Sequence, residues 1–176
     1  MNASVFIATS LDGFIAREDG AIDWLPEPDG TGEDYGYQAF MDTVDVLVMG
    51  RYTYETVLDF GTWPYETPVV VLSHRSIEQP EEQDASVERM AGPPREILQR
   101  LADRGLTHAY VDGGRTIQRF LADGLIQRLT ITVVPVLLGE GLPLFGPLPH
   151  DVRLQLLDTR SFPNGLVQHR YAVVAE

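Results

Sequence analysis

The sequence predicts an α/β domain with a mostly parallel central sheet that antiparallel strands complete on its C-terminal side. Short apolar runs typical of buried strands alternate with segments whose apolar residues recur at helical spacing, the order expected when helices join parallel strands. Residues 128–136 and 166–174 instead alternate in part between apolar and polar side chains, which is typical of antiparallel strands. The length of 176 residues suits one domain spanning residues 1–176.

The composition narrows the possible functions. A formal net charge of -13 argues against nucleic acid or an anionic membrane as a partner, because both favour a basic surface. The absence of cysteine excludes disulfides and thiolate metal sites, and the four histidines lie too far apart in the sequence for metal-ligand spacings, so no metal is expected. No apolar run reaches the roughly 18 residues of a membrane span, and no basic segment precedes the first apolar run. We therefore expect a cytoplasmic protein.

The N-terminal half is expected to contribute three buried strands, at residues 5–8, 45–50 and 68–73. Each is a short apolar run of the kind found inside parallel sheets. Asp12-Gly13 signals a turn after the first strand, and a loop rich in glycine, proline and acidic residues follows it.

This loop and the helix after it are expected near a ligand. Loops of such length in compact domains are usually functional or disordered, and Trp24 within it either folds back onto the core or faces a ligand. Residues 33–43 predict a helix, because Tyr37, Phe40 and Met41 are spaced to share one face.

The C-terminal half continues the pattern. A surface segment around a short edge strand is expected at residues 78–89, and a helix at 94–104. Residues 109–121 begin as a strand, break at two glycines and resume as a helix. Three further strands are expected at residues 128–136, 152–158 and 166–174, with a glycine-proline loop at 137–146.

Three of the predicted strands end in a small or polar residue followed by a cation. The endings are Gly50-Arg51, Ser73-His74-Arg75 and Gly113-Gly114-Arg115. Because α/β sheets bind ligands outside the carboxyl ends of their strands, the three endings together predict a ligand with several phosphates. Glycine lets the backbone approach such a ligand closely, and the free amides at a helix start suit a phosphate. The alternative is a set of tight turns with incidental arginines.

The order of these motifs resembles the dihydrofolate reductase superfamily over nearly the whole chain, which implies a three-layer α/β/α fold. Residues 49–55, 71–75 and 113–117 resemble that family's phosphate-binding, ribose-binding and glycine-pair segments. Residues 10–16 and 135–145 are more similar to the RibD C-terminal domain, the reductase of the riboflavin pathway, and to its stand-alone relatives. Those reductases usually have a lysine in the first strand and a Ser-x-Trp-Ile segment after it. In this chain the strand has no lysine, and residues 21–25 are Ala-Ile-Asp-Trp-Leu. This departure leaves the identity of the substrate open.

The resemblance implies an NADPH-dependent reductase that transfers hydride to a C=N or related bond of a small heterocyclic, pterin- or pyrimidine-like substrate. The ribose 2'-phosphate would be surrounded by Arg51, Arg115 and either His74 or Arg75. Because NADH lacks this phosphate, the resemblance favours NADPH. The complete set of implied NADPH-binding residues is Ala8, Gly13, Ile15, Gly50, Arg51, Tyr52, Thr53, Leu72, Ser73, His74, Arg75, Gly113, Gly114, Arg115, Thr116 and Ile117.

Substrate binding is expected from Trp24, Asp34 and Tyr37, with Asp34 as the candidate catalytic acid. Asp34 lies where dihydrofolate reductases have their substrate-binding acid, and it could guide a proton if its surroundings raise its pKa. An aspartate at a helix start can also serve only the helix dipole.

Two other functions stay open at this stage. The chain could be a non-catalytic NADP(H)-binding or regulatory protein of the same fold, or an interaction domain that binds no nucleotide. The resemblance also implies a homodimer, formed through the late strands and the loop at residues 137–145.

Overall fold

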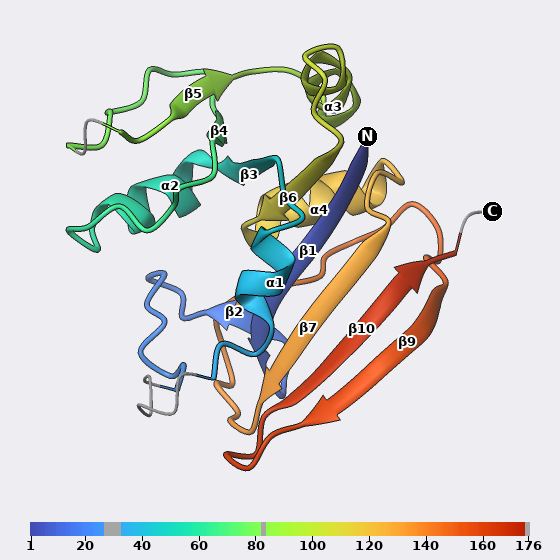
Figure 1. Ribbon diagram of the computed structural model, residues 1–176. Coiled ribbons are helices and arrows are strands. Elements are labelled where there is room, and N and C mark those ends of the chain that lie inside the picture. Colours follow the sequence, from blue (N-terminus) through green and yellow to red (C-terminus); the bar gives the residue numbers. More distant parts are fainter. Residues whose placement is uncertain (27–32, 82–83, 175–176) are drawn as a thin grey trace.

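The computed structural model describes residues 1–26, 33–81 and 84–174, and it has an eight-stranded sheet with helices on both faces (Figure 1). The strands are β1 (Asn2–Ser10), β2 (Phe14–Ala16), β3 (Val46–Gly50), β4 (Val69–Leu72), β5 (Val87–Met90), β6 (His108–Asp112), β7 (Arg128–Val134), β8 (Leu142–Pro143), β9 (Leu154–Ser161) and β10 (Val167–Val173). The helices are α1 (Tyr37–Met41), α2 (Arg51–Leu58), α3 (Pro94–Ala102) and α4 (Gly114–Ala122). The large sheet has the order β5-β4-β3-β6-β1-β7-β10-β9, which confirms the predicted fold class.

The change from parallel to antiparallel pairing falls one strand later than predicted. β7 was expected to be antiparallel, but it pairs in parallel with β1 from Ser4–Arg128 to Ser10–Val134. The antiparallel pairs are β7 with β10 and β10 with β9. The alternation of apolar and polar side chains in β7 shows which face of the strand is buried. It does not show whether the strand runs parallel or antiparallel to its neighbour. Leu129 and Ile131 pack into the main core, whereas Thr130 on the opposite face stays partly exposed.

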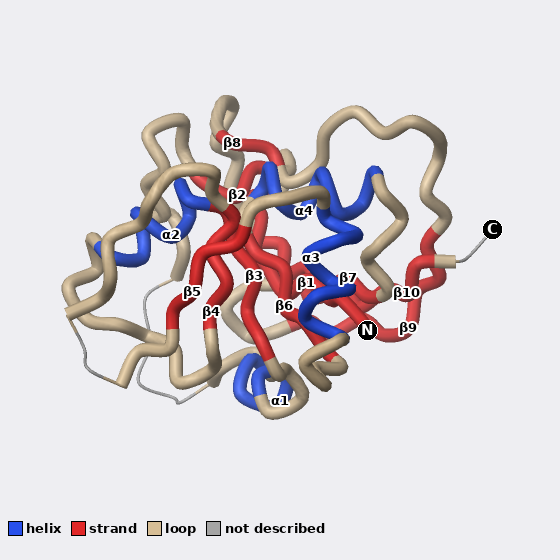
Figure 2. The backbone as a smooth tube through the Cα atoms, turned by 90° about the horizontal axis from the view of Figure 1, so that it is seen from above, coloured by secondary structure: helices blue, strands red, loops and turns tan. Residues whose placement is uncertain are grey.

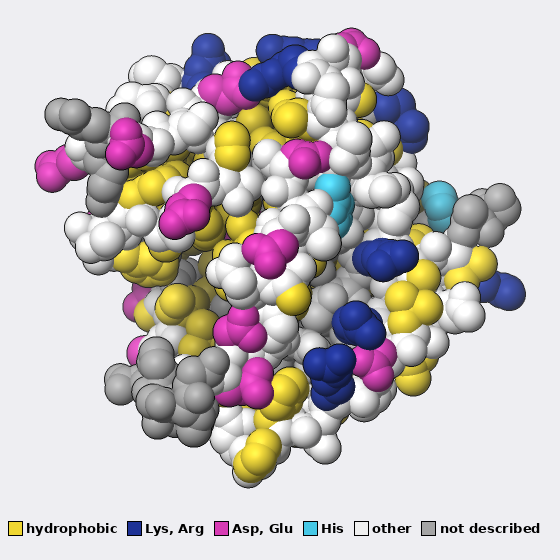
Figure 3. Space-filling view, viewed as in Figure 1, with side chains coloured by type: hydrophobic (Ala, Val, Ile, Leu, Met, Phe, Trp, Pro, Cys, Tyr) yellow, Lys and Arg dark blue, Asp and Glu magenta, His cyan; other side chains and the backbone are white. Residues whose placement is uncertain are grey.

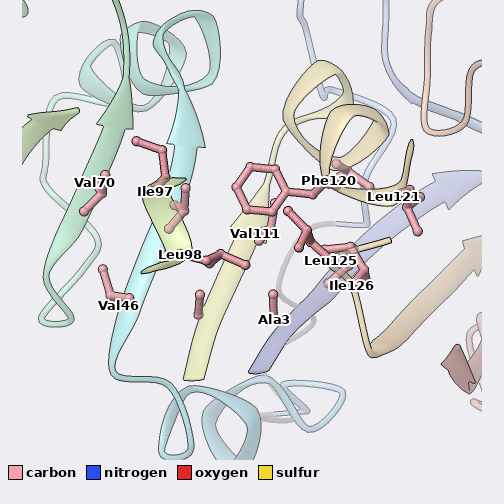
Figure 4. Close-up of a cluster of buried hydrophobic side chains, with 14 of the residues drawn as sticks. Ala3, Val46, Val70, Ile97, Leu98, Val111, Phe120, Leu121, Leu125 and Ile126 are labelled. Carbon is pink, nitrogen blue, oxygen red and sulfur yellow. The ribbon is translucent and has the colours of Figure 1, made fainter. Parts of the chain in front are cut away.

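The main core lies between the sheet and the helices α3 and α4. Ile97 and Leu98 of α3 and Phe120 of α4 pack over the small side chains Ala3 and Val111 of the central strands (Figure 4). Pro94 occupies the first turn of α3, where its missing N–H costs nothing. The helices predicted at residues 94–104 and after the two glycines are therefore confirmed.

The opposite face of the sheet is covered by α1 and α2 and is rich in aromatic side chains. Figure 2 shows α1 on one side of the sheet and α3 and α4 on the other. Phe40 of α1 packs edge-on against Tyr110 with ring centroids 5.1 Å apart. The hydroxyl group of Tyr110 donates a hydrogen bond to the carbonyl oxygen of Phe6 at 2.8 Å. Aromatic contacts therefore hold α1 on the sheet.

Helix α1 is shorter than the predicted helix at residues 33–43. Tyr35 and Gly36 have φ angles of 57° and 82°, so the backbone ahead of Tyr37 is left-handed and cannot belong to the helix. Asp34 lies before this turn and not in the first helical turn. None of the helices in the described ranges is long and apolar enough to cross a bilayer.

The predicted turn at Asp12-Gly13 and the predicted glycine-proline loop lie together in space. β2 follows the turn and pairs with β8, which lies within the loop, in a two-stranded ribbon that the sequence did not predict. The carboxylate of Asp12 accepts hydrogen bonds from the backbone N–H groups of Leu138 at 3.2 Å and Gly139 at 2.7 Å. This carboxylate joins two segments more than 120 residues apart.

Asp45 makes a similar connection and gives a testable stability prediction. Its Oδ2 accepts hydrogen bonds from the N–H and hydroxyl groups of Thr107, at 2.7 and 2.8 Å, and from the N–H of His108 at 3.0 Å. We expect Asp45→Ala to lower the free energy of unfolding by about 2 kcal/mol at pH 7, because these donors lose a charged acceptor. Urea denaturation measures the loss, with Asp42→Ala as a control in which one exposed side-chain bond is lost.

The same hydrogen bonds hold the pKa of Asp45 below its usual value. A lowered pKa stabilises the folded state above the unfolded pKa, and this contribution is lost as the pH falls through the folded pKa. The difference between Asp45→Ala and the unaltered protein should therefore shrink below about pH 4. A difference that stays constant down to that pH would contradict this account.

Candidate active site

The carboxyl ends of β4, β3, β6 and β1 lie next to one another at one edge of the sheet, because these strands are parallel neighbours. The three predicted strand endings therefore share this edge. We call residues 50–53, 73–75 and 112–117 together the rim. Helix α2 begins directly after β3, and α4 begins one residue after β6, so two helices start at the rim (Figure 1).

The first turns of α2 and α4 touch each other through their glycines. A Cβ atom at Gly50 would lie 2.8 Å from Oγ1 of Thr116, and a Cβ atom at Gly113 would collide with Oγ1 of Thr53. No side chain caps either helix, and neither first turn contains an acidic residue. The first amides of a helix have no partner within the helix. Two adjacent sets of free N–H groups thus point out of the rim, as phosphate binding requires.

The ribbon of β2 and β8 forms a wall beside the second glycine. A Cβ atom at Gly114 would lie 3.0 Å from Cδ1 of Ile15 and 3.1 Å from the carbonyl oxygen of Pro143. Gly13 starts the ribbon with a φ of 89°, and its carbonyl oxygen accepts a hydrogen bond from the N–H of Leu144 at 3.0 Å. Ile15 therefore lies beside the rim, next to Gly114.

The cations of the rim differ in how far they are already paired. Arg51 forms an exposed ion pair with Glu55, at 2.5 Å between Nε and Oε1. Arg115 is exposed and makes no hydrogen bond or ion pair with the described residues. The hydroxyl group of Ser73 accepts a hydrogen bond from the N–H of Arg75 at 3.0 Å and donates one to its carbonyl oxygen at 2.8 Å, which fixes that turn.

A cavity of about 420 Å³ continues from the rim between α3 and α4. His74, Arg119 and Asp123 contribute its polar and charged groups, and Pro93 and Pro94 at the start of α3 contribute an apolar wall. This volume lies within the range of about 300–1,000 Å³ typical of small-ligand pockets.

Asp112, the last residue of β6, adds an acid to the rim. Its Oδ1 accepts a hydrogen bond from the N–H of Gly113 at 2.8 Å. Burial raises the pKa of Asp112 to about 6, although the Gly113 N–H group opposes this rise. The charge of Asp112 adds to burial in raising the pKa of Tyr37 to about 12, so this phenol lies close to the carboxylate. The residue as a whole is still partly exposed, so a bound molecule can reach it.

Comparison with known proteins identifies the family. Residues 3–168 match the family model of the RibD C-terminal domain. The chain belongs to the RibD C-terminal domain family. An uncharacterized relative in this comparison, YwjB of Bacillus subtilis (strain 168), is 36% identical over 167 residues that cover 94% of each chain.

Solved structures agree with the RibD C-terminal domain assignment. A protein of Shewanella sp. PV-4, whose assignment to riboflavin biosynthesis is provisional, is 41% identical, with a TM-score of 0.91 and coverage of 99% of this chain and 100% of that one. The dihydrofolate reductase of Enterococcus faecalis, solved in complex with NADP(H), shares the fold with a TM-score of 0.65 at 19% identity, over 98% of this chain and 96% of that one.

Most of the cofactor-binding residues predicted for this RibD C-terminal domain lie at the rim. Gly50, Thr53, Gly113 and Thr116 are in mutual contact there. Ile117 belongs to the same helix start, but its side chain is fully buried in the core, so it can offer only its backbone to a ligand. Four of the predicted residues lie outside the rim as defined. They are Ala8 in β1, Gly13 just before β2, Ile15 in β2 and Leu72 at the end of β4.

The structure gives Asp34 a different environment from the one its predicted role requires. Its two carboxylate oxygens accept hydrogen bonds from the N–H groups of Gly36 at 2.9 Å and Gln38 at 2.8 Å. These bonds hold the pKa of Asp34 below its usual value, whereas the prediction required a raised pKa. Asp34 is exposed and serves as a cap for α1. The acid with a raised pKa is Asp112, which sequence reasoning missed.

The sequence did carry one signal for Asp112. Tyr110 and Asp112 are two residues apart in a strand, so they point to the same face of the sheet, while the apolar Ala109 and Val111 point to the main core. A carboxylate next to a buried tyrosine at a strand end is an uncommon arrangement. Strand periodicity therefore marked Asp112 as facing the aromatic side of the sheet.

Two of the predicted substrate-binding residues are aromatic, and both Trp24 and Tyr37 lie within the described residues. Tyr37 packs edge-on against Phe6 with ring centroids 5.6 Å apart and lies close to Asp112. The indole N–H of Trp24 is buried and has no hydrogen-bond partner among the described residues. Tyr52 donates a hydrogen bond to the carbonyl oxygen of Asp19 at 3.0 Å, which joins this loop to the start of α2. Part of the predicted loop, residues 27–32, lies outside the described residues.

Proposed function

We propose that this RibD C-terminal domain is an NADPH-dependent reductase that acts on a small heterocyclic, pyrimidine-like substrate. The observation that carries the proposal is the contact between two uncapped helix starts, at Gly50-Arg51 and Gly113-Gly114, beside a carboxyl group with a raised pKa. The helix starts suit a dinucleotide phosphate, and the carboxyl group suits proton transfer. Few binding sites need both.

The rim residues fit a dinucleotide. The free amides of the two first turns would hold its pyrophosphate, and the exposed guanidinium groups of Arg75 and Arg115 would meet the ribose 2'-phosphate. The cavity beside His74 offers room for a nucleoside. When bound, NADPH supplies hydride. Since the protein is acidic overall, these local groups must supply the attraction for a phosphate.

Asp112 is the residue that we propose to deliver the proton. A carboxyl group with a pKa of about 6 is protonated in about a tenth of the molecules at pH 7, far more than an ordinary aspartate, and can donate to a substrate nitrogen. The charge of Asp112 contributes to the raised pKa of Tyr37 in α1, and the buried N–H of Trp24 has no hydrogen-bond partner among the described residues. Burial keeps the pKa of this acid high.

A thermal-shift comparison with NADPH and NADH tests the cofactor. We expect NADPH to raise the Tm more than NADH does at equal concentration. We expect Arg75→Gln/Arg115→Gln to weaken NADPH binding roughly tenfold or more and to leave NADH binding nearly unchanged, because the 2'-phosphate loses its cations. Arg100→Gln, an exposed arginine of α3 away from the rim, is the matched control.

A turnover screen separates a reductase from a non-catalytic binding protein of the same fold. NADPH oxidation is followed with a panel of pyrimidine and pterin substrates. Oxidation with at least one of them supports the proposal. Tight NADPH binding without oxidation across the panel would favour the non-catalytic alternative, and no response to either nucleotide would exclude both.

A further inference from the structure

A second cavity lies on the aromatic face of the sheet, on the side of α1 that faces the late strands. Its volume is about 280 Å³, and it runs between α1 and the strands β7, β10 and β9. We call it the α1 groove. Gly36, Ala39 and Thr43 line it from α1 and its two ends, while Leu157 and Gln168 line it from β9 and β10. Its volume is at the lower limit of pockets that hold small ligands.

The charge of the α1 groove is opposite to that of the protein. Arg128, Arg160 and Arg170 all line it, and Figure 3 shows basic side chains gathered beside α1 over the late strands. Within the described ranges, Asp158 is the one carboxylate that pairs with these arginines. Its Oδ2 lies 3.2 Å from Nε of Arg160 and 3.1 Å from Nη2 of Arg170. The side chain of Arg128 has no ion pair or hydrogen bond with the described residues. The three arginines and Asp158 leave a surplus of two positive charges in a chain whose net charge is -13.

His108 and Ser4 line the α1 groove from β6 and β1, and Ser4 lies opposite Arg128 of the neighbouring strand β7. Nδ1 of His108 lies 2.7 Å from the carbonyl oxygen of Thr43, which can only accept a hydrogen bond, so Nδ1 carries a proton. Nε2 of the same ring lies 2.8 Å from Oγ of Ser4, a buried hydroxyl group. These bonds hold the imidazole in place as a fixed part of the wall.

Apolar side chains form the rest of the groove wall. Phe6 and Phe40 line the groove from the sheet and from α1, and Leu157 lines it from the edge strand. Leu157 is 48% exposed, more than an aliphatic side chain buried in a core would be. The groove thus offers an apolar surface next to a surplus of two positive charges.

The α1 groove is separate from the rim. Ser4, His108 and Arg128 lie at the amino ends of β1, β6 and β7, while the rim lies at the carboxyl ends. Six residues of strand separate Ser4 from the end of β1, which corresponds to roughly 20 Å. A molecule in the polar part of the groove would therefore not occupy the dinucleotide site.

We infer that the α1 groove binds a small phosphate monoester with an apolar group. The dianionic phosphate matches the surplus of two positive charges, and guanidinium groups bind phosphate through paired N–H groups. Arg128 and Arg170 hold the phosphate, while Phe40 and Leu157 contact the apolar part. An acidic patch on another protein would need a wider surface than this groove offers.

The inference can be tested with phenyl phosphate, which combines an aromatic ring with a phosphate monoester. In an NMR titration of the full chain, we expect saturable shifts of the amides of Ala39, Thr43, Thr130 and Gln168, both with and without NADPH. Phenol, which lacks the phosphate, should bind at least roughly tenfold more weakly. Because the readout needs neither NADPH binding nor turnover, it is independent of the proposed reductase activity.

Two variants test which arginines bind the phosphate group. Arg128→Gln/Arg170→Gln should weaken phenyl phosphate binding at least roughly tenfold, and Arg153→Gln, an exposed arginine just before β9, should leave it unchanged. If the double variant does not fold, Arg128→Gln alone serves, because Arg128 loses no partner among the described residues. Three results would each overturn the inference. The amide shifts could be confined to the rim, or the double variant could bind phenyl phosphate as tightly as the unaltered protein. Sedimentation and cross-saturation could also show that the groove is buried in a dimer.

Discussion

Asp112→Asn is expected to reduce turnover by about 10²- to 10⁴-fold while NADPH binding is retained, because asparagine cannot deliver a proton. Its amide has nearly the shape of the carboxyl group, and its oxygen can still accept the hydrogen bond from the N–H of Gly113. The measurement is NADPH oxidation with the substrate found in the screen, together with the thermal shift caused by NADPH.

The same variant is expected to be more stable than the unaltered protein at high pH. Burial raises the pKa of Asp112 from 3.8 to about 6, so the folded state disfavours the ionised carboxylate. This cost is absent below the unfolded pKa, develops as the pH rises from about 4 to 6, and is constant above that window. We expect Asp112→Asn to gain about 1–3 kcal/mol in unfolding free energy at pH 8 and almost nothing at about pH 3.5. Urea denaturation at the two pH values measures both.

Asp34→Asn, assayed alongside, decides between the two carboxyl groups. The lowered pKa of Asp34 and its two backbone hydrogen bonds indicate a structural role. If Asp34→Asn lost most of its turnover and Asp112→Asn kept full activity, Asp34 would be the proton donor. Equal stability of Asp112→Asn and the unaltered protein at every pH would show that Asp112 is not buried in the way described.

Gly113→Ala is expected to lower the free energy of unfolding by about 2–5 kcal/mol and to abolish NADPH binding. Two causes add. The residue has a φ of 89°, which strains any side chain, and its new Cβ would collide with Oγ1 of Thr53. Relief of the collision would push α2 and α4 apart and separate the two sets of free amides. Urea denaturation and the NADPH thermal shift measure the two effects.

Gly105→Ala is the matched control, because Gly105 has a φ of 87° and a Cβ atom added there would meet no atom within 4 Å. It should show the backbone strain alone, about 1–2 kcal/mol, with normal NADPH binding. Combining Gly113→Ala with Thr53→Ala should recover part of the stability, because the colliding oxygen is removed. The proposed contact between the two helix starts would be wrong if Gly113→Ala behaved like Gly105→Ala.

Several elements were predictable because their signals are local. The buried strands β3, β4 and β6 are apolar runs bounded by polar residues, and α4 follows directly from helical spacing after two glycines. Two errors also have local causes. The left-handed backbone at Tyr35 and Gly36 shortens α1, and the alternation in β7 reflects which face is covered rather than the direction of the strand.

The candidate site was predictable only in part. The strand endings with Arg51, Arg75 and Arg115 were visible in the sequence, since each lies next to an apolar run. Asp112 was missed because an acid at a strand end normally faces water, and only the surrounding protein raises its pKa. The α1 groove was not visible, because Arg128 and Arg170 are 42 residues apart and meet only when β7 pairs with β10.

The sequence by itself determined most of the strands and helices of the main sheet, and which residues stand at the strand exits. These properties depend on spacing between near neighbours along the chain. Only the tertiary structure decided that Thr53 meets Gly113, that Asp112 is the buried acid, and that three arginines surround one groove. Contacts, burial and local charge depend on distances in space between residues far apart in sequence, and strand pairing sets those distances.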